Sequence, residues 1–242
     1  MTQASLSSSR FSIADAVGSA IVLYADNFKL FFLSSLAAAI VPIVMGILDN
    51  TGNELLQGLW FVFLPFAFCF QVIVLLALIQ MIAKRSLNED VDAGILFQDA
   101  LLIFWKGAGS ILLFGLILVV GILLLVIPFF YWSTIFFFFL YFISLEEARM
   151  GDAFKLSEQL VSGQFILVFQ AHIVVVLALA AIFLPIIIGL FLIGVDGMFR
   201  SIIFHLLIAL VVPSFLGFYY SLFCWLKKSK APAGTISVYD TK

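Results

Sequence analysis

The chain has 242 residues, of which 64% are hydrophobic and only 11% are charged. Soluble domains carry about 25% charged residues, so this composition excludes a water-soluble fold and predicts a single integral membrane domain over residues 1–242. The formal net charge of −2 neither favours nor excludes an anionic partner. Asp15 and Asp26 interrupt the first 27 residues, so this segment is not expected to be a secretory signal.

Six apolar segments are long enough to cross a bilayer. The clearest evidence is a run of 39 residues, 107–145, without one Asp, Glu, Lys or Arg. A helix needs roughly 20 apolar residues to cross the hydrocarbon core, so this run predicts two crossings that meet near Pro128. The sequence predicts an all-α polytopic fold with six transmembrane helices, at about residues 28–48, 59–82, 109–127, 129–145, 166–194 and 199–226.

Three further segments have the pattern of amphipathic helices that lie along the membrane surface. Residues 12–27, 91–105 and 150–163 each place apolar side chains on one face and polar side chains elsewhere. Each segment contains an Asp-Ala pair and leads into an apolar run. This recurrence predicts a unit of one interfacial helix followed by a helical hairpin, used three times.

The distribution of Lys and Arg predicts the orientation in the membrane. With six crossings both termini lie on one side, and eleven of the twelve Lys and Arg residues fall on that side, leaving only Arg200 on the other. An excess of Lys and Arg marks the cytoplasmic side. Both termini are therefore expected in the cytoplasm, and the external connections are expected to be short.

The segment GILLLVIPFFYWSTIFFFFLYFISLEEARMGDAFKLSEQLVSGQF combines two apolar helices around a Pro turn, an acidic turn and an amphipathic helix. It resembles the YciC-like family of bacterial inner-membrane proteins, and it is similar to the membrane domain attached to some glycerophosphodiester phosphodiesterases. The residues that carry the resemblance are Ile127, Pro128, Glu146, Glu147, Ala153, Ser157 and Gly163. The resemblance implies a bacterial inner-membrane location and a six-span layout. It implies no reaction, because the phosphodiesterases keep their catalytic residues in a separate soluble domain.

Three polar side chains inside the predicted spans are the candidate functional residues, namely Gln71, His172 and His205. Polar groups are costly in lipid and often functional there. The two histidines lie at different predicted depths, and neither has a second ligand three or four residues away, so no metal site is expected. Each histidine is interpreted either as a neutral side chain bonded to a neighbouring helix or as part of a proton relay.

The sequence contains no recognisable enzyme motif. It has no phosphate-binding glycine loop, no HExxH and no GxSxG. Glu146 and Glu147 are adjacent beside Arg149, which is typical of a solvated turn. We therefore expect no catalytic activity and no cofactor. The predicted cytoplasmic face mixes acids with bases, so no nucleic-acid partner is expected either.

Two functions follow as hypotheses. The first is a non-enzymatic membrane protein in envelope or lipid homeostasis, or an accessory subunit, whose partners are membrane lipids and a membrane protein or a second copy of the chain. The second is a transporter or channel for a small or amphipathic substrate, with Gln71, His172 and His205 along its path. The absence of a carboxylate in the middle of any span argues against ion coupling.

Overall fold

The computed structural model describes residues 11–49, 54–124 and 126–230, and this part of the chain is helical without a strand. The expected all-α class is confirmed. The described helices are α1 (Ile13–Asp26), α2 (Phe28–Asp49), α3 (Glu54–Ser86), α4 (Ala93–Leu123), α5 (Val126–Ile135), α6 (Phe139–Glu146), α7 (Met150–Val161), α8 (Phe165–Leu192) and α9 (Gly197–Lys230).

Six helical stretches are long and apolar enough to cross a membrane, as the sequence predicts. They are Phe28–Ile47, Val62–Ser86, Ala93–Leu123, Ile127–Glu146, Phe165–Leu192 and Gly197–Lys230. The protein is therefore a multi-pass helical membrane protein.

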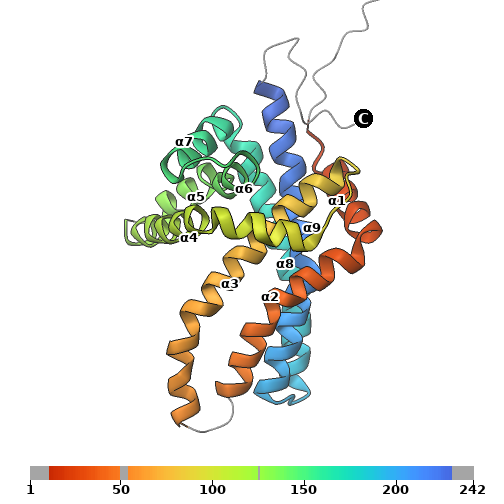
Figure 1. Cartoon of the computed structure of the whole chain (residues 1–242), viewed down its shortest axis with the longest axis vertical. Helices are drawn as coiled ribbons and strands as arrows, with labels where there is room; N and C mark the ends of the chain where they lie inside the picture. The colour runs from red at the N-terminus through yellow and green to blue at the C-terminus, as the bar shows by residue number, and fades with distance from the viewer. Residues whose placement is uncertain (1–10, 50–53, 125, 231–242) are drawn as a thin grey trace, which may run out of the picture.

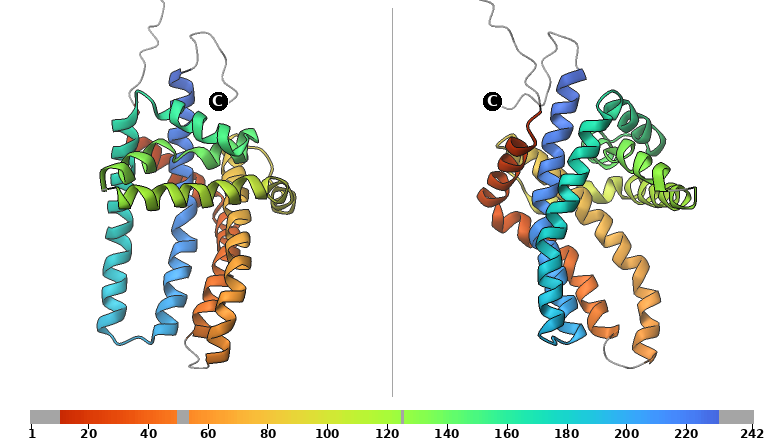
Figure 2. Two further views of the ribbon diagram at one scale, coloured as in Figure 1. Left: turned by 90° about the vertical axis from the view of Figure 1, so that its left-hand side faces the viewer. Right: turned by 180° about the vertical axis from the view of Figure 1, so that it is seen from behind.

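The six stretches do not all run in one direction. Helices α2, α3, α8 and α9 run along the long axis of the molecule, whereas α4, α5, α6 and α7 lie crosswise in every view (Figures 1 and 2). The crosswise helices sit toward the end that holds α1 and the last turns of α9 (Figure 1). The end of α2, the start of α3 and the turn from α8 to α9 lie at the opposite end (Figure 1).

The second predicted surface helix and the third predicted span form one continuous helix, α4. It begins where the Asp92 carboxylate accepts hydrogen bonds from the backbone N–H groups of Gly94, at 2.8 Å, and Ile95, at 3.4 Å. No proline separates the two parts, and the helix continues through Gly107 and Gly109. Gly107 allows close contact with α3, since a Cβ there would lie 2.8 Å from a methyl group of Leu76.

The fourth predicted span, 129–145, is divided between α5 and α6. The break leaves the carbonyl of Ile135 and the N–H of Phe138 outside a regular helix, and one side chain satisfies both. Ser157 of α7 donates its hydroxyl to Ile135 O at 2.8 Å and accepts from Phe138 N at 3.0 Å. Pro128 lies at the third residue of α5, where a missing N–H removes no helical bond.

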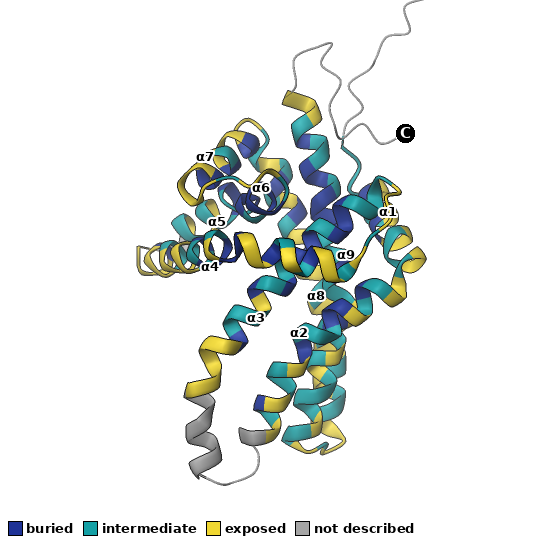
Figure 3. Ribbon diagram, in the orientation of Figure 1, coloured by how far each residue is buried: buried dark blue, intermediate teal, exposed yellow. Residues whose placement is uncertain are grey.

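The fully buried large side chains gather at the end of the molecule that holds α1, which we call the packed end (Figure 3). Most of them come from the second half of α3, from α6 with the residue before it, and from the last turns of α9. Among them are Leu76, Ile79, Met81, Ile82, Phe138, Ile143, Leu222, Phe223 and Leu226. The packed end is therefore the hydrophobic core of the protein.

The remaining halves of α2, α3, α8 and α9 form the open end, where the surface is mostly exposed or half-buried (Figure 3). Helix α8 shows the contrast best. Its buried residues are Val168, Ala171 and Val175, all near its start, whereas Phe191 and Leu192 are 70% and 79% exposed. An apolar surface of this extent requires lipid or protein to cover it.

Candidate functional site

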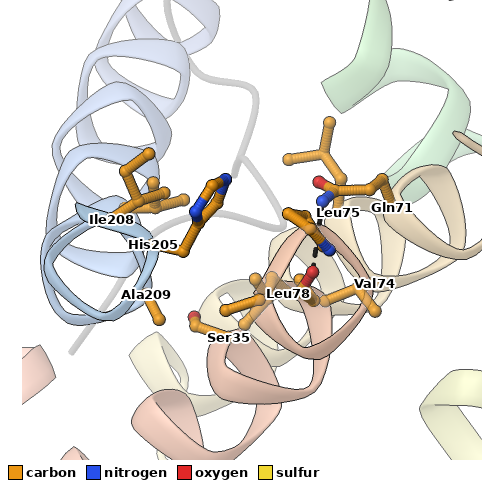
Figure 4. Close-up of a pocket in the computed structure, with 12 residues that line it drawn as sticks. Ser35, Gln71, Val74, Leu75, Leu78, His205, Ile208 and Ala209 are labelled. Carbon is orange, nitrogen blue, oxygen red and sulfur yellow. Dashed lines mark hydrogen bonds between the residues drawn. The ribbon is translucent and has the colours of Figure 1, made fainter. Parts of the chain in front are cut away.

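A small pocket where the packed end meets the open end brings together two of the three candidate polar residues. It has a volume of about 100 Å³ and lies between α2, α3 and α9 (Figure 4). Its polar lining consists of Ser35 from α2, Gln71 from α3 and His205 from α9, and the other lining residues are apolar. Spans that are distant in the sequence thus place an amide, an imidazole and a hydroxyl around one space.

Gln71 compensates for a proline in the neighbouring helix. Pro42 has no N–H, so the carbonyl of Ala38, four residues earlier in α2, loses its helical hydrogen bond. The Gln71 side chain donates from Nε2 to Ala38 O at 3.1 Å across the helix pair (Figure 4). In lipid an unpaired carbonyl is costly, so this bond gives Gln71 a structural role.

His205 is held by its own helix. Its Nδ1 lies 2.8 Å from Ser201 O and 3.5 Å from Ser201 Oγ. A carbonyl only accepts, so Nδ1 carries the proton in the neutral ring and Nε2 is left as a hydrogen-bond acceptor. The ring faces the pocket (Figure 4). His205 can therefore accept a proton or a hydrogen bond from a group that enters.

The Ser35 hydroxyl is a further polar group in the lining of this pocket. Ser35 is buried, and its hydroxyl has no hydrogen-bond partner among the described residues. Helices α2 and α9 also pack closely at Gly46, since a Cβ added there would lie 2.5 Å from Ser201 Oγ. The pocket thus offers the Ser35 hydroxyl and the His205 ring as groups available to a small polar ligand.

His172 lies elsewhere and does not line this pocket. It bonds through Nδ1 to Val168 O at 2.7 Å within α8, and its ring stands edge-on to Phe137 at 4.4 Å between ring centres. Tyr219 of α9 lies 5.2 Å away, also between ring centres. Its Nε2 is buried without a partner in the described part of the chain. The aromatic contacts give His172 a packing role between α8, α9 and the break before α6.

A larger polar cavity, which the sequence does not reveal, lies at the packed end between α1, α3 and α9. It has a volume of about 610 Å³. Its charged lining residues are Asp26, Arg85 and Lys228, from three segments far apart in the chain. The sequence shows these residues only as charged residues near the ends of separate helices and does not indicate that they lie close together. The one local signal is Asn88, which follows α3 with a left-handed φ of 58° and also lines the cavity.

The described residues contain no group of three or more His, Cys, Asp or Glu side chains placed to hold a metal ion. Cys69 and Cys224 are both free thiols. The places with polar groups for a ligand are the small pocket beside His205 and the large polar cavity at the packed end.

No match was found in three comparisons with known proteins, namely a scan against protein-family models, a search of the curated proteins and a search of the solved structures.

Proposed function

We propose that the chain is a non-enzymatic protein of a bacterial inner membrane that holds phospholipid between its helices and acts in envelope or lipid homeostasis. The observation that carries the proposal is an apolar cavity of about 280 Å³ between α1, α8 and α9. Every residue that lines it is apolar except Ser214. A cavity of this size and lining fits part of an acyl chain.

The exposure of α8 supports the same proposal. Beyond Val175 its apolar side chains find little cover from the rest of the described chain. Bilayer lipid is the simplest cover for such a surface. A membrane-protein partner or a second copy of the chain is the alternative cover, and it would make the protein an accessory subunit.

Native mass spectrometry of the protein, extracted with its surrounding membrane, tests the proposal. We expect phospholipid to remain bound after transfer to detergent. Ala178 lines the cavity, so Ala178→Phe should reduce the retained lipid severalfold. Ala180 lies on the exposed face of the same helix, so Ala180→Phe is the matched control and should retain lipid as the wild type does.

Two results would contradict lipid holding. The wild type could lose all lipid in detergent, or Ala178→Phe could retain as much lipid as Ala180→Phe. A protein partner at fixed stoichiometry in place of lipid would assign the exposed face of α8 to an accessory-subunit contact.

For the orientation, we propose that both termini lie in the cytoplasm. Cationic side chains at the ends of α3 and α9, among them Lys84, Arg85 and Lys227, lie at the packed end, and Arg200 lies at the start of α9 at the opposite end. This asymmetry supports a cytoplasmic packed end. A reporter fused after Lys242 should be active only in its cytoplasmic form, and activity outside the cytoplasm would reverse the orientation.

Transport of a small or amphipathic substrate is the second candidate function, and the pocket beside His205 favours it. If His205 lines a path, His205→Ala should abolish flux in proteoliposomes while thermal stability stays close to that of the wild type. His172 packs among aromatic rings, so His172→Ala should lower stability and leave flux per folded molecule unchanged. Equal flux in the wild type and both variants would remove this candidate.

A further inference from the structure

The polar cavity at the packed end combines a cation and an anion that do not pair with each other. Arg85 at the end of α3 and Asp26 at the end of α1 both line it. The ion pair that Arg85 forms is with Asp90, at 3.8 Å, and the Asp90 side chain is fully exposed. A long pair with an exposed carboxylate contributes little, so much of the charge of Arg85 is available to a ligand.

The surroundings of Arg85 strengthen this point. Its side chain is 28% exposed, and its Nε is buried without a hydrogen-bond partner among the described residues. A guanidinium group has five N–H donors and binds phosphate oxygens in pairs. A partly buried arginine with unused donors therefore favours an anionic ligand.

The rest of the lining fits a phosphate group and its ester. Lys228 of α9 adds a second cation, and hydroxyl groups come from Ser19, Ser86 and Ser221. Asp26 places one negative charge on the same cavity wall. Arg85 and Asp26 thus present one cation and one anion that do not pair with each other, which matches a ligand that carries a phosphate and an ammonium group.

The position of the cavity identifies the source of that ligand. The ends of α1, α3 and α9 meet at the packed end (Figure 1), where cationic side chains gather. Trp225, an aromatic residue of the kind that marks the boundary between lipid and water, lines the cavity together with the exposed apolar side chain of Val22. Such aromatic residues are enriched at the level of the lipid headgroups, so this lining favours a headgroup as the ligand.

We propose that the cavity between α1, α3 and α9 binds the headgroup of a zwitterionic phospholipid, with the phosphate on Arg85 and the ammonium group on Asp26. The inference rests on the proposed function, since it names the lipid class that the protein holds. A volume of about 610 Å³ is in the range of small-molecule sites. The cavity differs from the apolar one beside α8, so the two can be altered separately.

The test is lipid selectivity of the full-length protein. Purified protein is exposed to an equimolar mixture of phosphatidylethanolamine and phosphatidylglycerol, and native mass spectrometry counts the retained molecules of each. The wild type should enrich phosphatidylethanolamine severalfold. Arg85→Gln removes the main phosphate ligand and should weaken retention of both lipids at this site about tenfold, as expected for a lost charged hydrogen bond.

Asp26→Asn should act differently, because it removes only the partner of the ammonium group. We expect the two lipids to be retained in equal numbers, since the preference for phosphatidylethanolamine is lost. Lys84→Gln is the matched control for Arg85, since Lys84 is its neighbour and does not line the cavity. Asp15→Asn on α1 is the control for Asp26. Both controls should behave as the wild type.

Three results would overturn the inference. The first is equal retention of both lipids by the wild type. The second is an unchanged ratio of phosphatidylethanolamine to phosphatidylglycerol in Asp26→Asn, and the third is lipid retention by Arg85→Gln that equals that of the wild type. Binding of soluble glycerophosphoethanolamine without any retained lipid would also overturn it, by assigning the cavity to a soluble metabolite. If lipid is retained without headgroup preference, this inference fails alone, whereas absence of lipid from every variant defeats the proposed function itself.

Discussion

The packed end and the open end share the long helices α2, α3, α8 and α9 (Figure 1), and they differ in how polar groups are satisfied. At the packed end side chains bond to the backbone of other helices. Ser144 donates to Leu76 O at 2.9 Å, and Tyr141 donates to Leu216 O at 2.9 Å. At the open end His205 bonds within its own helix, to Ser201 O. Bonds between helices fix their relative positions, whereas bonds within a helix do not.

Packing follows the same division. Ring contacts at the packed end join α6 to α9, as in the edge-to-face pair of Phe142 and Phe223, whose ring centres lie 5.2 Å apart. The Lys227 ammonium pairs with Glu146, which joins the same two helices at their charged ends. In the described part of the open end, contacts between helices are mostly apolar, apart from the bond from Gln71 to Ala38 O and the Arg200 guanidinium, which lies 5.4 Å from the centre of the Phe191 ring. We infer that the packed end sets the fold.

The largest expected effect concerns the crosswise hairpin of α4 and α5. Because these helices lie across the long axis toward the packed end (Figure 2), we expect their shared turn to stay on the cytoplasmic side or within that leaflet. Leu123 and Ile193 are each 79% exposed. In a chain without its native cysteines, Ile193→Cys should react with an impermeant thiol reagent from outside intact cells, and Leu123→Cys should not. Equal labelling would show that α4 and α5 cross the membrane.

Removal of an aromatic ring should lower the free energy of unfolding much more at the packed end than at the open end. Phe223 is fully buried, so Phe223→Ala should lower the free energy of unfolding by about 3 kcal/mol through the cavity it leaves. Phe66 at the open end is 67% exposed, so Phe66→Ala should cost less than about 1 kcal/mol. Unfolding titrations in mixed detergent measure both. Equal losses would mean that the open end is packed against something as tightly as the core.

Ser157→Ala tests the polar bridge at the break between α5 and α6. The change leaves the carbonyl of Ile135 and the N–H of Phe138 unpaired in a buried place, which should cost about 2 kcal/mol. Ser133 bonds only to Phe130 O within its own helix, so Ser133→Ala should stay within about 0.5 kcal/mol of the wild type. A negligible loss in Ser157→Ala would show that the break is satisfied in another way.

The smallest expected effect tests the role of Gln71. Gln71→Leu leaves Ala38 O unpaired and should cost about 1 kcal/mol. Pro42→Ala returns an N–H to the same carbonyl, so Gln71→Leu in that background should cost almost nothing. The wild type, the two single variants and the double variant form a double-mutant cycle. Its coupling energy measures how far the two changes act on the same carbonyl. Additive effects would show that Gln71 stabilises the protein by some other contact, or serves a ligand.

The candidate site was only partly accessible from the sequence. Gln71 and His205 were identified because polar residues inside apolar spans are conspicuous, but their meeting depends on the packing of α3 beside α2 and α9. The bond from Gln71 to the carbonyl freed by Pro42 joins residues whose relation no sequence spacing indicates. The charged cavity at the packed end was missed, because Asp26, Arg85 and Lys228 come from three separate helix ends.

The sequence by itself determined that this protein lies in a membrane and that its fold is helical. The apolar run at 107–145 and the low charge leave helices in lipid as the arrangement that satisfies every backbone group. Tertiary structure decided which apolar helices run along the axis and which lie crosswise. The physical reason is that length and hydropathy are properties of one helix, whereas direction depends on bonds between helices, such as the bridge that Ser157 makes at the break before α6.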